Sequence, residues 1–463
     1  MKTTTAGAVP TNPAAVTALL TTLLADDAQQ PPPLTYLRRK AGRGLVAVYG
    51  NTRDPRRLYT VTVEEGAFGG ETGVRCLPGV TPRWQGQWPG LVAEPHLGLA
   101  VQAFPSDRAL PALTAAMTPA TQPQLWEALH AAGTARLPAS AAWNLHTVQA
   151  HPVRYKPGDR VVIRYELDFR GSGADDAAHS RVSVIGKLYR DAAQATAARS
   201  LLERLRLSAG RAWSAAPVAS VDTLGLLLTE DLGDGHGEPP TWPGIDVIQP
   251  GEQLAPAVIA AAARALADLH ASDIDDATTP LRSGKDEGGK AAKRADVLSA
   301  YLPAAAPELG RISHRLCDRL RSLEPEAYRP AHGSYKPSQL LVRDTYAFVI
   351  DFDQFCRADP ALDVGYFVAY LRPPGTFYHR RGTRAWFEAA AVTFRQTYVA
   401  AARQRGVSPA ESASIVARST VYEAALLLKI AARRANRLQS PRPGEIQAIL
   451  HDITACLDAD QRS

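Results

Sequence analysis

The chain has 463 residues, of which 45% are hydrophobic and 21% charged, and its formal net charge is +6 at pH 7. This composition is typical of a soluble globular protein with two or three domains. No apolar run approaches the ~20 residues of a membrane helix, and the N-terminal sequence lacks the pattern of a secretion signal. Four scattered cysteines without a CxxC favour reduced thiols over a disulfide scaffold or a zinc site. We therefore expect a cytoplasmic protein.

The β-rich and helical parts of the chain follow one another in order. The first 33 residues, rich in Thr, Ala and Pro, are predicted to be a flexible tail. Strand-like runs split by Gly and Pro predict a cap over residues 34–140 and a second β-rich segment, with one helix, over 141–234. Residues 235–463 have helical spacing, although "SGKDEGGKAAKR" (283–294) is predicted to be a polar loop. The sequence thus predicts an α+β fold with strands first and helices after.

The two β-rich segments show a weak internal repeat. Residues 37–50 align without gaps with 153–166 and share a Lys-x-Gly turn and a Tyr in the outgoing strand. Residues 99–110 also resemble 184–195, with Gln102 where the second copy has Lys187. A true repeat would make the first segment a degenerate cap without an active site. Chance similarity between two β-hairpins is the alternative.

Several residues in the second segment have the types that a nucleotide site needs. Lys187 ends the run "VSVIGKLYR", where an ammonium can reach phosphate oxygens, and Glu203 in the next predicted helix can hold that ammonium. The turn "KPGDR", which contains Gly158, can cover a nucleotide, although a plain β-turn also explains it. "LLLTEDLGDG" is predicted to be an edge strand, after which backbone groups from Glu230 to Leu232 can pair with an adenine.

The strongest signal is "FVIDFDQFCRADPALDVG". An apolar strand places Asp351 at its end, and Asp353 lies on the same face if the strand continues. Two carboxylates in such a place repel each other unless a cation lies between them, so this pair predicts a divalent metal site. Asp359 and Asp363, further along, are interpreted as turn and helix-cap residues.

The segment "HGSYKPSQLLV" precedes this strand, and with it residues 148–370 resemble the aminoglycoside phosphotransferase and choline kinase superfamily of the protein-kinase-like fold. That family has a His-Gly-Asp loop closed by an Asn, then Ile-Asp-Phe/Trp-Asp/Glu, then Asp-Pro-x-x-Asp. The corresponding residues are His332, Gly333, Ser334, Gln339, Ile350–Asp353 and Asp359–Asp363. The N-terminal cap and the Gln in the loop are also similar to those of maltokinases.

The resemblance implies a bilobal fold and the use of ATP and Mg²⁺. Lys187 and Glu203 would form the ion pair that anchors the phosphates. Asp351 would be the principal Mg²⁺ ligand and the loop amide of Gln339 the second, with Asp353 beside them.

One departure from the family pattern concerns the reaction itself. The family's catalytic Asp is Ser334 here, and a serine is no base near neutral pH. His332 still shapes the loop, and Lys336 can contact a transferred phosphate. A general base contributes about 10²–10⁴ in rate, whereas phosphoryl transfer depends mainly on positioning and electrostatics. Three hypotheses therefore stay open: a phosphotransferase with an atypical loop, a pseudokinase that binds nucleotide or a partner, and a different transfer from ATP.

The acceptor is constrained by charge alone. Residues 371–442 contain thirteen Lys and Arg against Glu388, Glu411 and Glu423. Such a region can attract an anion, although a solvated helical face would give the same count. An acceptor pocket lined by these basic residues would not suit a polycationic aminoglycoside. We therefore expect a small acceptor with a hydroxyl group that is sugar-like or anionic. We expect neither a membrane nor a nucleic acid as a partner.

Overall fold

The computed structural model describes residues 32–40, 44–63, 75–76, 91–94, 99–139, 142–172, 179–208, 214–233, 241–274, 279–372, 377–435 and 444–460. The chain divides into two compact units, the first made of Met1–Arg199 and Pro217–Asp231, the second of Ser200–Ala216 and Leu232–Ser463. Residues 1–31 of the predicted tail lie outside the described residues. The predicted boundary at 140 falls inside the first unit, and the domain limits stay predictions. Among the described helices, none has the length and apolarity that crossing a bilayer requires.

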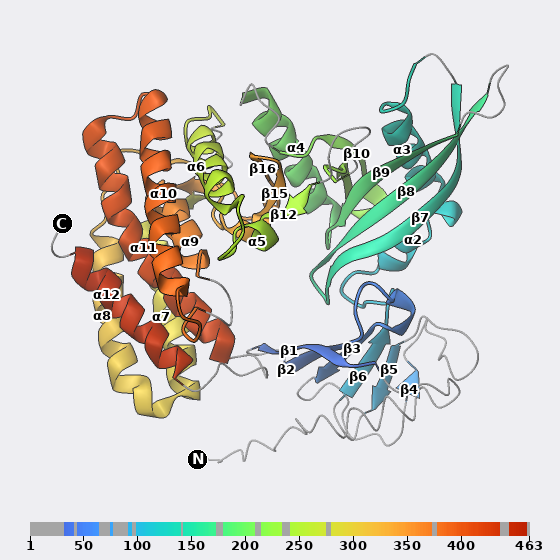
Figure 1. The fold of residues 1–463 in the computed structure, drawn as a ribbon. Coiled ribbons are helices and arrows are strands. Elements are labelled where there is room, and N and C mark those ends of the chain that lie inside the picture. Colours follow the sequence, from blue (N-terminus) through green and yellow to red (C-terminus); the bar gives the residue numbers. More distant parts are fainter. Residues whose placement is uncertain are drawn as a thin grey trace. The chain divides into compact units, whose positions relative to one another are not determined.

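The first unit begins with an antiparallel sheet in the order β1-β2-β3-β6-β5-β4 (Figure 1). Its strands are β1 (Leu34–Lys40), β2 (Gly44–Tyr49), β3 (Tyr59–Val63), β4 (Arg75–Cys76), β5 (Leu91–Glu94) and β6 (Leu99–Ala103). Runs such as "LVAVY" and "YTVTV" are rich in β-branched and aromatic residues, which favour strands.

A second antiparallel sheet follows in the order β10-β11-β9-β8-β7. Its strands are β7 (Ala142–Lys156), β8 (Arg160–Ser172), β9 (His179–Leu188), β10 (Pro217–Val221) and β11 (Leu226–Glu230). Alternate residues of β8, among them Ile163, Tyr165 and Leu167, are fully buried because a strand turns every second side chain to one face. They share a core with Leu113 of α2 (Leu113–Met117) and Leu129 of α3 (Pro123–Thr134). The predicted edge position of β11 is wrong, because β10 pairs with its outer side.

The internal repeat extends to one hairpin. Both aligned segments form hairpins, β1–β2 and β7–β8. However, β9 lies directly beside β8, whereas β3 lies between β2 and β6. Gln102 in β6 and Lys187 in β9 therefore do not occupy equivalent positions in their sheets. The side-chain oxygen of Gln102 instead accepts a hydrogen bond from the backbone N–H of Arg108 at 2.9 Å.

The second unit is mainly helical (Figure 1). Its helices are α5 (Gly244–Val247), α6 (Ala255–His270), α7 (Gly284–Tyr301), α8 (Ala306–Arg321), α9 (Ala361–Tyr370), α10 (Thr383–Gln404), α11 (Pro409–Ala435) and α12 (Glu445–Asp460), and α4 (Ala192–Ser208) runs into it from the first unit. Its short strands are β12 (Trp242–Pro243), β15 (Leu340–Arg343) and β16 (Tyr346–Val349) in one sheet, and β13 (Leu281–Arg282), β17 (Cys356–Ala358) and β14 (Arg329–Ala331) in another. Strands first and helices after confirm the predicted α+β class.

Helix α9 lies at the centre of this unit. Its residues from Ala361 to Ala369 are all buried, as expected of a helix surrounded by others. The rings of Phe367 on α9 and Phe394 on α10 stack with their centroids 4.1 Å apart. Helix α9 thus holds its polar residues, Asp363 and Tyr366, inside the protein.

The loop predicted at 283–294 is wrong, since these residues begin α7. The side chain of Ser283 accepts the N–H of Asp286, and the carboxylate of Asp286 accepts the N–H of Ser283 at 2.8 Å. This reciprocal capping box starts a helix. A Cβ on Gly284 would lie 2.0 Å from the carbonyl oxygen of Leu320 in α8. The glycine therefore permits close helix packing and does not indicate a flexible loop.

Candidate active site

The loop between β14 and β15 is organised by one buried carboxylate. Asp363 accepts the backbone N–H of His332 at 2.6 Å and that of Tyr335 at 3.4 Å. Burial alone would raise the pKa of Asp363, but the hydrogen bond and charge of His270 and the N–H of Gly333 lower it. Asp363 lies in the first turn of α9, where Pro360 takes the cap position. Its predicted role as a helix cap is therefore wrong, and it holds the loop instead.

His332 and Gly333 fix the shape of this loop. His332 is fully buried, and its Nε2 lies 3.1 Å from the carbonyl oxygen of Ile350. Burial lowers the pKa of His332, so the ring is neutral at pH 7. Gly333 has φ of 72°, and a Cβ there would lie 2.1 Å from the carbonyl oxygen of Gln354. His332 is therefore a positioning residue that ties the loop to the chain entering Asp351.

Three predicted site residues come together at the open end of the β15–β16 hairpin. Ser334 donates its hydroxyl to Gln339 Oε1 at 3.3 Å, and Gln339 Nε2 donates to Asp351 Oδ2 at 3.1 Å. The N–H of Ile350 bonds to the carbonyl of Gln339 at 2.9 Å, which fixes the register of the two segments. Asp351 has φ of 66°, a backbone conformation that is costly for a residue with a side chain. Such stored strain is typical of functional sites.

Asp353 is placed differently from the expectation. Strand β16 ends at Val349, and the N–H of Phe355 bonds to the carbonyl of Phe352 at 2.9 Å in a turn. The same-face argument for Asp351 and Asp353 is therefore wrong, because it assumed that the strand continues. Asp353 lies half-buried in this turn, and its part in a metal site stays a prediction.

The donor atoms present fit Mg²⁺. Carboxylate and amide oxygens are the ligands that this hard cation prefers. A half-turn of the Gln339 amide would direct its oxygen toward the side where Asp351 Oδ2 lies, and such a rotation exchanges two nearly isosteric groups. Among the described residues there is no group of three or more His, Cys, Asp or Glu that could hold a metal ion. A site here therefore depends on the amide of Gln339 as well as on the carboxylates.

Lys336 points along the loop toward α9. Its Nζ lies 5.4 Å from the centre of the Tyr370 ring, and the side chain is half-buried. This places an ammonium two residues after Ser334.

The predicted nucleotide residues of the first unit lie on its second sheet. Lys187 in β9 is opposite Val162 and Leu227, with its Nζ 5.2 Å from the centre of the Tyr189 ring. Glu230 ends β11. The turn residue Gly158, with φ of 67°, donates its N–H to Asp107 Oδ2 at 2.7 Å.

Asp107 was not predicted as a contact of this turn. It also accepts the hydroxyl of Tyr155 at 2.7 Å, so it fastens the turn at both Tyr155 and Gly158. It precedes that turn by about fifty residues, and nothing in the local sequence signals the contact.

Two predicted nucleotide residues belong to the second unit. Glu203 lies in α4 and is assigned to the second unit, whereas Lys187 belongs to the first. Leu232 is buried, and its carbonyl accepts a hydrogen bond from Arg343 at 2.9 Å. A backbone group that was expected to face an adenine thus has a partner within the chain. The roles of both residues stay predictions.

Six of the thirteen bases in segment 371–442 form ion pairs among the described residues, so its charge is partly neutralised. The ion pairs are Arg372 with Glu423 and Asp452, Arg384 with Asp452, Arg395 with Glu423, Arg405 with Asp268, Arg418 with Asp359 and Glu411, and Arg434 with Glu445. Four of these acids lie outside the segment, which is why the local charge count overstated its basicity. Asp359 also accepts the N–H of Ala361 at 3.0 Å, which confirms its predicted place in a turn.

A comparison with protein families identifies the chain. The model of the phosphotransferase enzyme family matches residues 170–408, just over half of the chain. This chain belongs to that family. The matched region contains Lys187, the loop from His332 to Gln339, and Asp351. The predicted superfamily is confirmed, and the similarity to maltokinases stays a prediction.

Other comparisons give distant matches. No curated protein matches the chain. A Ralstonia eutropha JMP134 protein assigned as an aminoglycoside phosphotransferase is 14% identical, with 73% of this chain and 98% of that one covered and a TM-score of 0.47. Macrolide 2′-phosphotransferase from Brachybacterium faecium is 19% identical, with coverages of 71% and 97% and a TM-score of 0.39. A glucosamine kinase is 15% identical, with 98% of each chain covered and a TM-score of 0.41.

Proposed function

We propose that this protein is an ATP- and Mg²⁺-dependent phosphotransferase that acts on a hydroxyl group of a small acceptor other than an aminoglycoside. The observation that carries the proposal is the hydrogen-bonded row of Ser334, Gln339 and Asp351 at the end of β16. The row aligns the position of the usual catalytic Asp with two oxygen-bearing side chains that suit a metal. Membership in the phosphotransferase enzyme family supports the same reaction class.

The residues of the row and Lys187 have different tasks in this proposal. Asp351 and Gln339 would hold Mg²⁺, which when bound offsets the negative charge of the phosphates. Lys187 would contact phosphate oxygens of ATP. Ser334 can accept a hydrogen bond from the acceptor hydroxyl and so orient it, but it cannot remove the proton near neutral pH.

The missing base is compatible with slow transfer. A bond forms between the acceptor oxygen and the γ-phosphorus, the bond from that phosphorus to the bridging oxygen breaks, and ADP leaves. The acceptor proton goes to solvent water. Because the transition state of phosphoryl transfer is loose, the nucleophile needs positioning more than activation.

A pseudokinase is the second candidate, and Ser334 is the observation that favours it. A protein of this kind would bind Mg·ATP through the same residues and release it unchanged. The two candidates differ in turnover and agree in binding.

The test measures Mg·ATP binding by calorimetry and ADP release with a broad panel of hydroxyl acceptors. We compare wild type with Asp351→Asn, with Ser334→Asp and with Asp344→Asn as the control. Asp344 also has positive φ, at 52°, but lies exposed in the β15–β16 turn. We expect Asp351→Asn to lower turnover about 10³-fold because a bound metal ion contributes several kcal/mol to transition-state stabilisation. Asp344→Asn should match wild type.

The outcomes separate the candidates. Unchanged Mg·ATP affinity in Asp351→Asn would overturn the site. Wild type that binds Mg·ATP without transfer, together with a Ser334→Asp variant that transfers phosphate, would favour the pseudokinase. Protection of cells from kanamycin-type drugs would contradict the acceptor class.

A further inference from the structure

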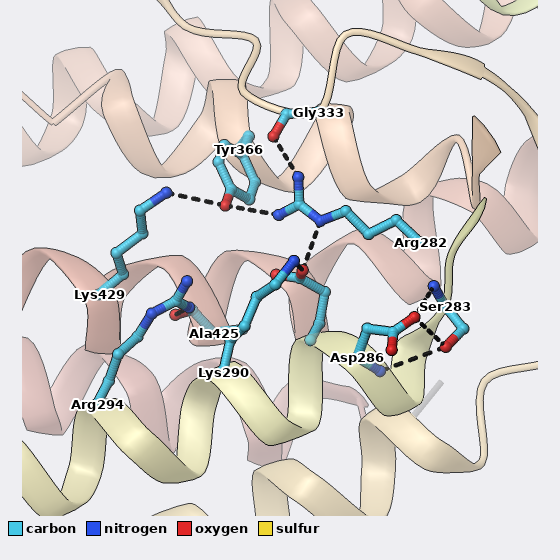
Figure 2. Close-up of polar contacts among 10 residues, drawn as sticks. Arg282, Ser283, Asp286, Lys290, Arg294, Gly333, Tyr366, Ala425 and Lys429 are labelled. Atoms are coloured by element: carbon cyan, nitrogen blue, oxygen red, sulfur yellow. Dashed lines mark hydrogen bonds and ion pairs between the residues drawn. The ribbon is translucent and has the colours of Figure 1, made fainter. Parts of the chain in front are cut away.

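A group of cations surrounds Tyr366 in the helical unit (Figure 2). The basic cluster consists of Arg282 at the end of β13, Lys290 and Arg294 on α7, Lys429 and Arg433 on α11, and the phenol of Tyr366 on α9. All of these residues belong to the second unit. They are separated by up to about 150 residues in sequence, and the fold brings them together.

The hydroxyl of Tyr366 joins two of the cations. It accepts hydrogen bonds from Arg282 at 3.0 Å and from Lys429 at 3.1 Å. The Lys429 ammonium also lies 4.9 Å from the centre of the Tyr366 ring. Burial raises the pKa of Tyr366, so the phenol is neutral at pH 7. Arg282 and Lys429 therefore share a polar partner that carries no negative charge.

The carboxylate of the cluster is already bound twice. Glu287 accepts hydrogen bonds from Arg282 at 2.5 Å and from Lys290 at 2.7 Å. Arg294 donates to the backbone carbonyl of Ala425 at 3.5 Å, another neutral oxygen. The nearby Asp286 accepts from the backbone and hydroxyl of Ser283, at 2.8 and 2.7 Å. Positive charge is therefore in excess around Tyr366.

The excess charge acts most strongly on Lys429. Burial, and after it the positive charges of Arg433, Arg294 and Arg282, together lower its pKa to about 6. Burial likewise lowers the pKa of Arg294. An anion beside these groups would reverse the charge repulsion and would receive several charge-assisted hydrogen bonds.

The basic cluster is connected to the candidate catalytic loop at two points. Arg282 donates to the carbonyl oxygen of Gly333 at 2.6 Å, next to Ser334. Arg433 donates to the hydroxyl of Tyr370 at 3.3 Å, and Lys336 of the loop lies over the same ring. A molecule held by this cluster would thus lie beside the loop that is expected to orient the acceptor.

We propose that the basic cluster binds a phosphate, sulfate or carboxylate group of the acceptor, an assignment that rests on the proposed function. The half-burial of Arg294 and Lys429 favours a small anionic group, because a nucleic acid or an acidic protein would contact exposed cations. The acceptor is then an anionic metabolite with a free hydroxyl.

Binding is tested with inorganic sulfate, which does not titrate near neutral pH. Calorimetry compares wild type, Lys429→Met and Arg294→Met with the control Lys293→Met, whose side chain lies exposed on α7. We expect sulfate affinity at pH 5.5, where Lys429 is protonated, to fall about 10- to 100-fold in the first two variants, because each loses a charge-assisted hydrogen bond. The control should bind sulfate like wild type. Circular dichroism shows whether each variant is folded.

Equal affinity in wild type and both folded variants would overturn the site, as would the absence of sulfate binding to wild type. Loss of sulfate binding when ATP saturates the protein would also overturn it, because the cluster would then be part of the nucleotide site.

A second measurement separates this inference from the proposed function. Matched acceptors, such as glucose with glucose 6-phosphate, are compared in ADP release at saturating Mg·ATP. We expect a lower KM for the phosphorylated member of a productive pair, and a rise of that KM of about 10-fold in Arg294→Met. Transfer with equal KM for both members would overturn the anionic acceptor but would still support the proposed phosphotransferase activity. Sulfate binding without any Mg·ATP binding would overturn the kinase and, with it, the acceptor assignment.

Discussion

Two polar groups on the same helix are built in opposite ways. Asp363 and Tyr366 lie one turn apart on α9. Around Asp363 a single negative charge is enclosed by backbone N–H groups and by His270, whose Nε2 lies 3.6 Å away. Around Tyr366 several cations share neutral oxygens and one carboxylate. The first group is electrostatically balanced within the chain, and the second is not.

We interpret the group around Asp363 as structural and the group around Tyr366 as the proposed anion site. A balanced buried charge stabilises the fold, because backbone N–H donors and a neighbouring histidine offset it. An unbalanced group costs stability, and an external counter-ion can relieve that cost. The predictions on Asp363 and Glu287 each change the charge of one group. The prediction on Gly333 tests the loop that contacts both, and the last follows the titration of Lys429.

The largest effect is expected from Asp363→Ala. Removing this carboxylate leaves His270 and the N–H of His332 without their buried partner, which should cost about 3–5 kcal/mol in the free energy of unfolding. Urea denaturation measures the loss, and Asp318→Ala on the exposed face of α8 is the control. Because the pKa of Asp363 is lowered in the folded state, its contribution is complete above its ordinary value of 3.8 and disappears as the pH falls below it. A loss below 1 kcal/mol would contradict the balanced-charge interpretation.

Gly333→Ala should have a smaller effect on stability and a clear one on turnover. Its φ of 72° and the approach of the Gln354 carbonyl leave no room for a Cβ. We expect a cost of about 1–3 kcal/mol, typical of one residue forced out of a favoured conformation. Gly382→Ala is a matched control, because Gly382 also has positive φ, at 81°, but has open space around its Cβ position. Equal losses in both variants would show that the contact with Gln354 does not fix the loop.

Glu287→Gln removes the carboxylate that pairs with Arg282 and Lys290, and so increases the excess of positive charge in the basic cluster. Burial would raise the pKa of Glu287, but the hydrogen bond and charge of Arg282 hold it at about 2, so the group is a carboxylate at neutral pH. Its removal should tighten sulfate binding about 3- to 10-fold, since more positive charge faces the anion. Asp286→Asn is the control, because the Asp286 carboxylate is engaged with Ser283. Weaker sulfate binding in folded Glu287→Gln would contradict this prediction.

The smallest effect concerns pH. Lys429, with its pKa lowered to about 6, faces Arg282, Arg294, Arg433, Glu287 and Tyr366. Guanidinium groups do not titrate near neutrality. Sulfate should therefore bind a few-fold more tightly at pH 5.5 than at pH 8, because protonation adds one positive charge.

The titration of Lys429 also affects stability. The folded protein binds fewer protons than the unfolded chain between pH 6 and the ordinary lysine pKa of 10.5. Lys429 therefore lowers stability progressively as the pH falls across that range. Lys429→Met should remove both this slope and the pH dependence of sulfate binding. Unaltered pH profiles in the variant would assign the titration to another group.

The sequence predicted the candidate catalytic loop well because its residues are close together. Ser334, Gln339 and Asp351 lie within a short segment whose spacing identifies a family, and a strand hairpin brings them together. The strand alternation of β8 and the helices of the second unit were equally readable, since both depend on local periodicity.

The basic cluster was not predictable in the same way. Arg282 and Lys429 meet at Tyr366 through tertiary packing, which no local pattern records. The charge count over 371–442 was misleading because acids such as Asp268 and Asp452 come from other parts of the chain. Glycines in 283–294 suggested a loop, whereas Gly284 permits close packing against α8.

The guanidinium of Arg282 has one further consequence. It contacts both Tyr366 of the basic cluster and the carbonyl of Gly333. An anion bound by Arg282 would therefore also act on the loop that contains Ser334. Binding energy from a part of the acceptor that does not react would then improve the alignment of the part that does. Water carries no such anion and would receive no such alignment. A kinase without a catalytic carboxylate could in this way protect ATP from hydrolysis while still serving its own acceptor.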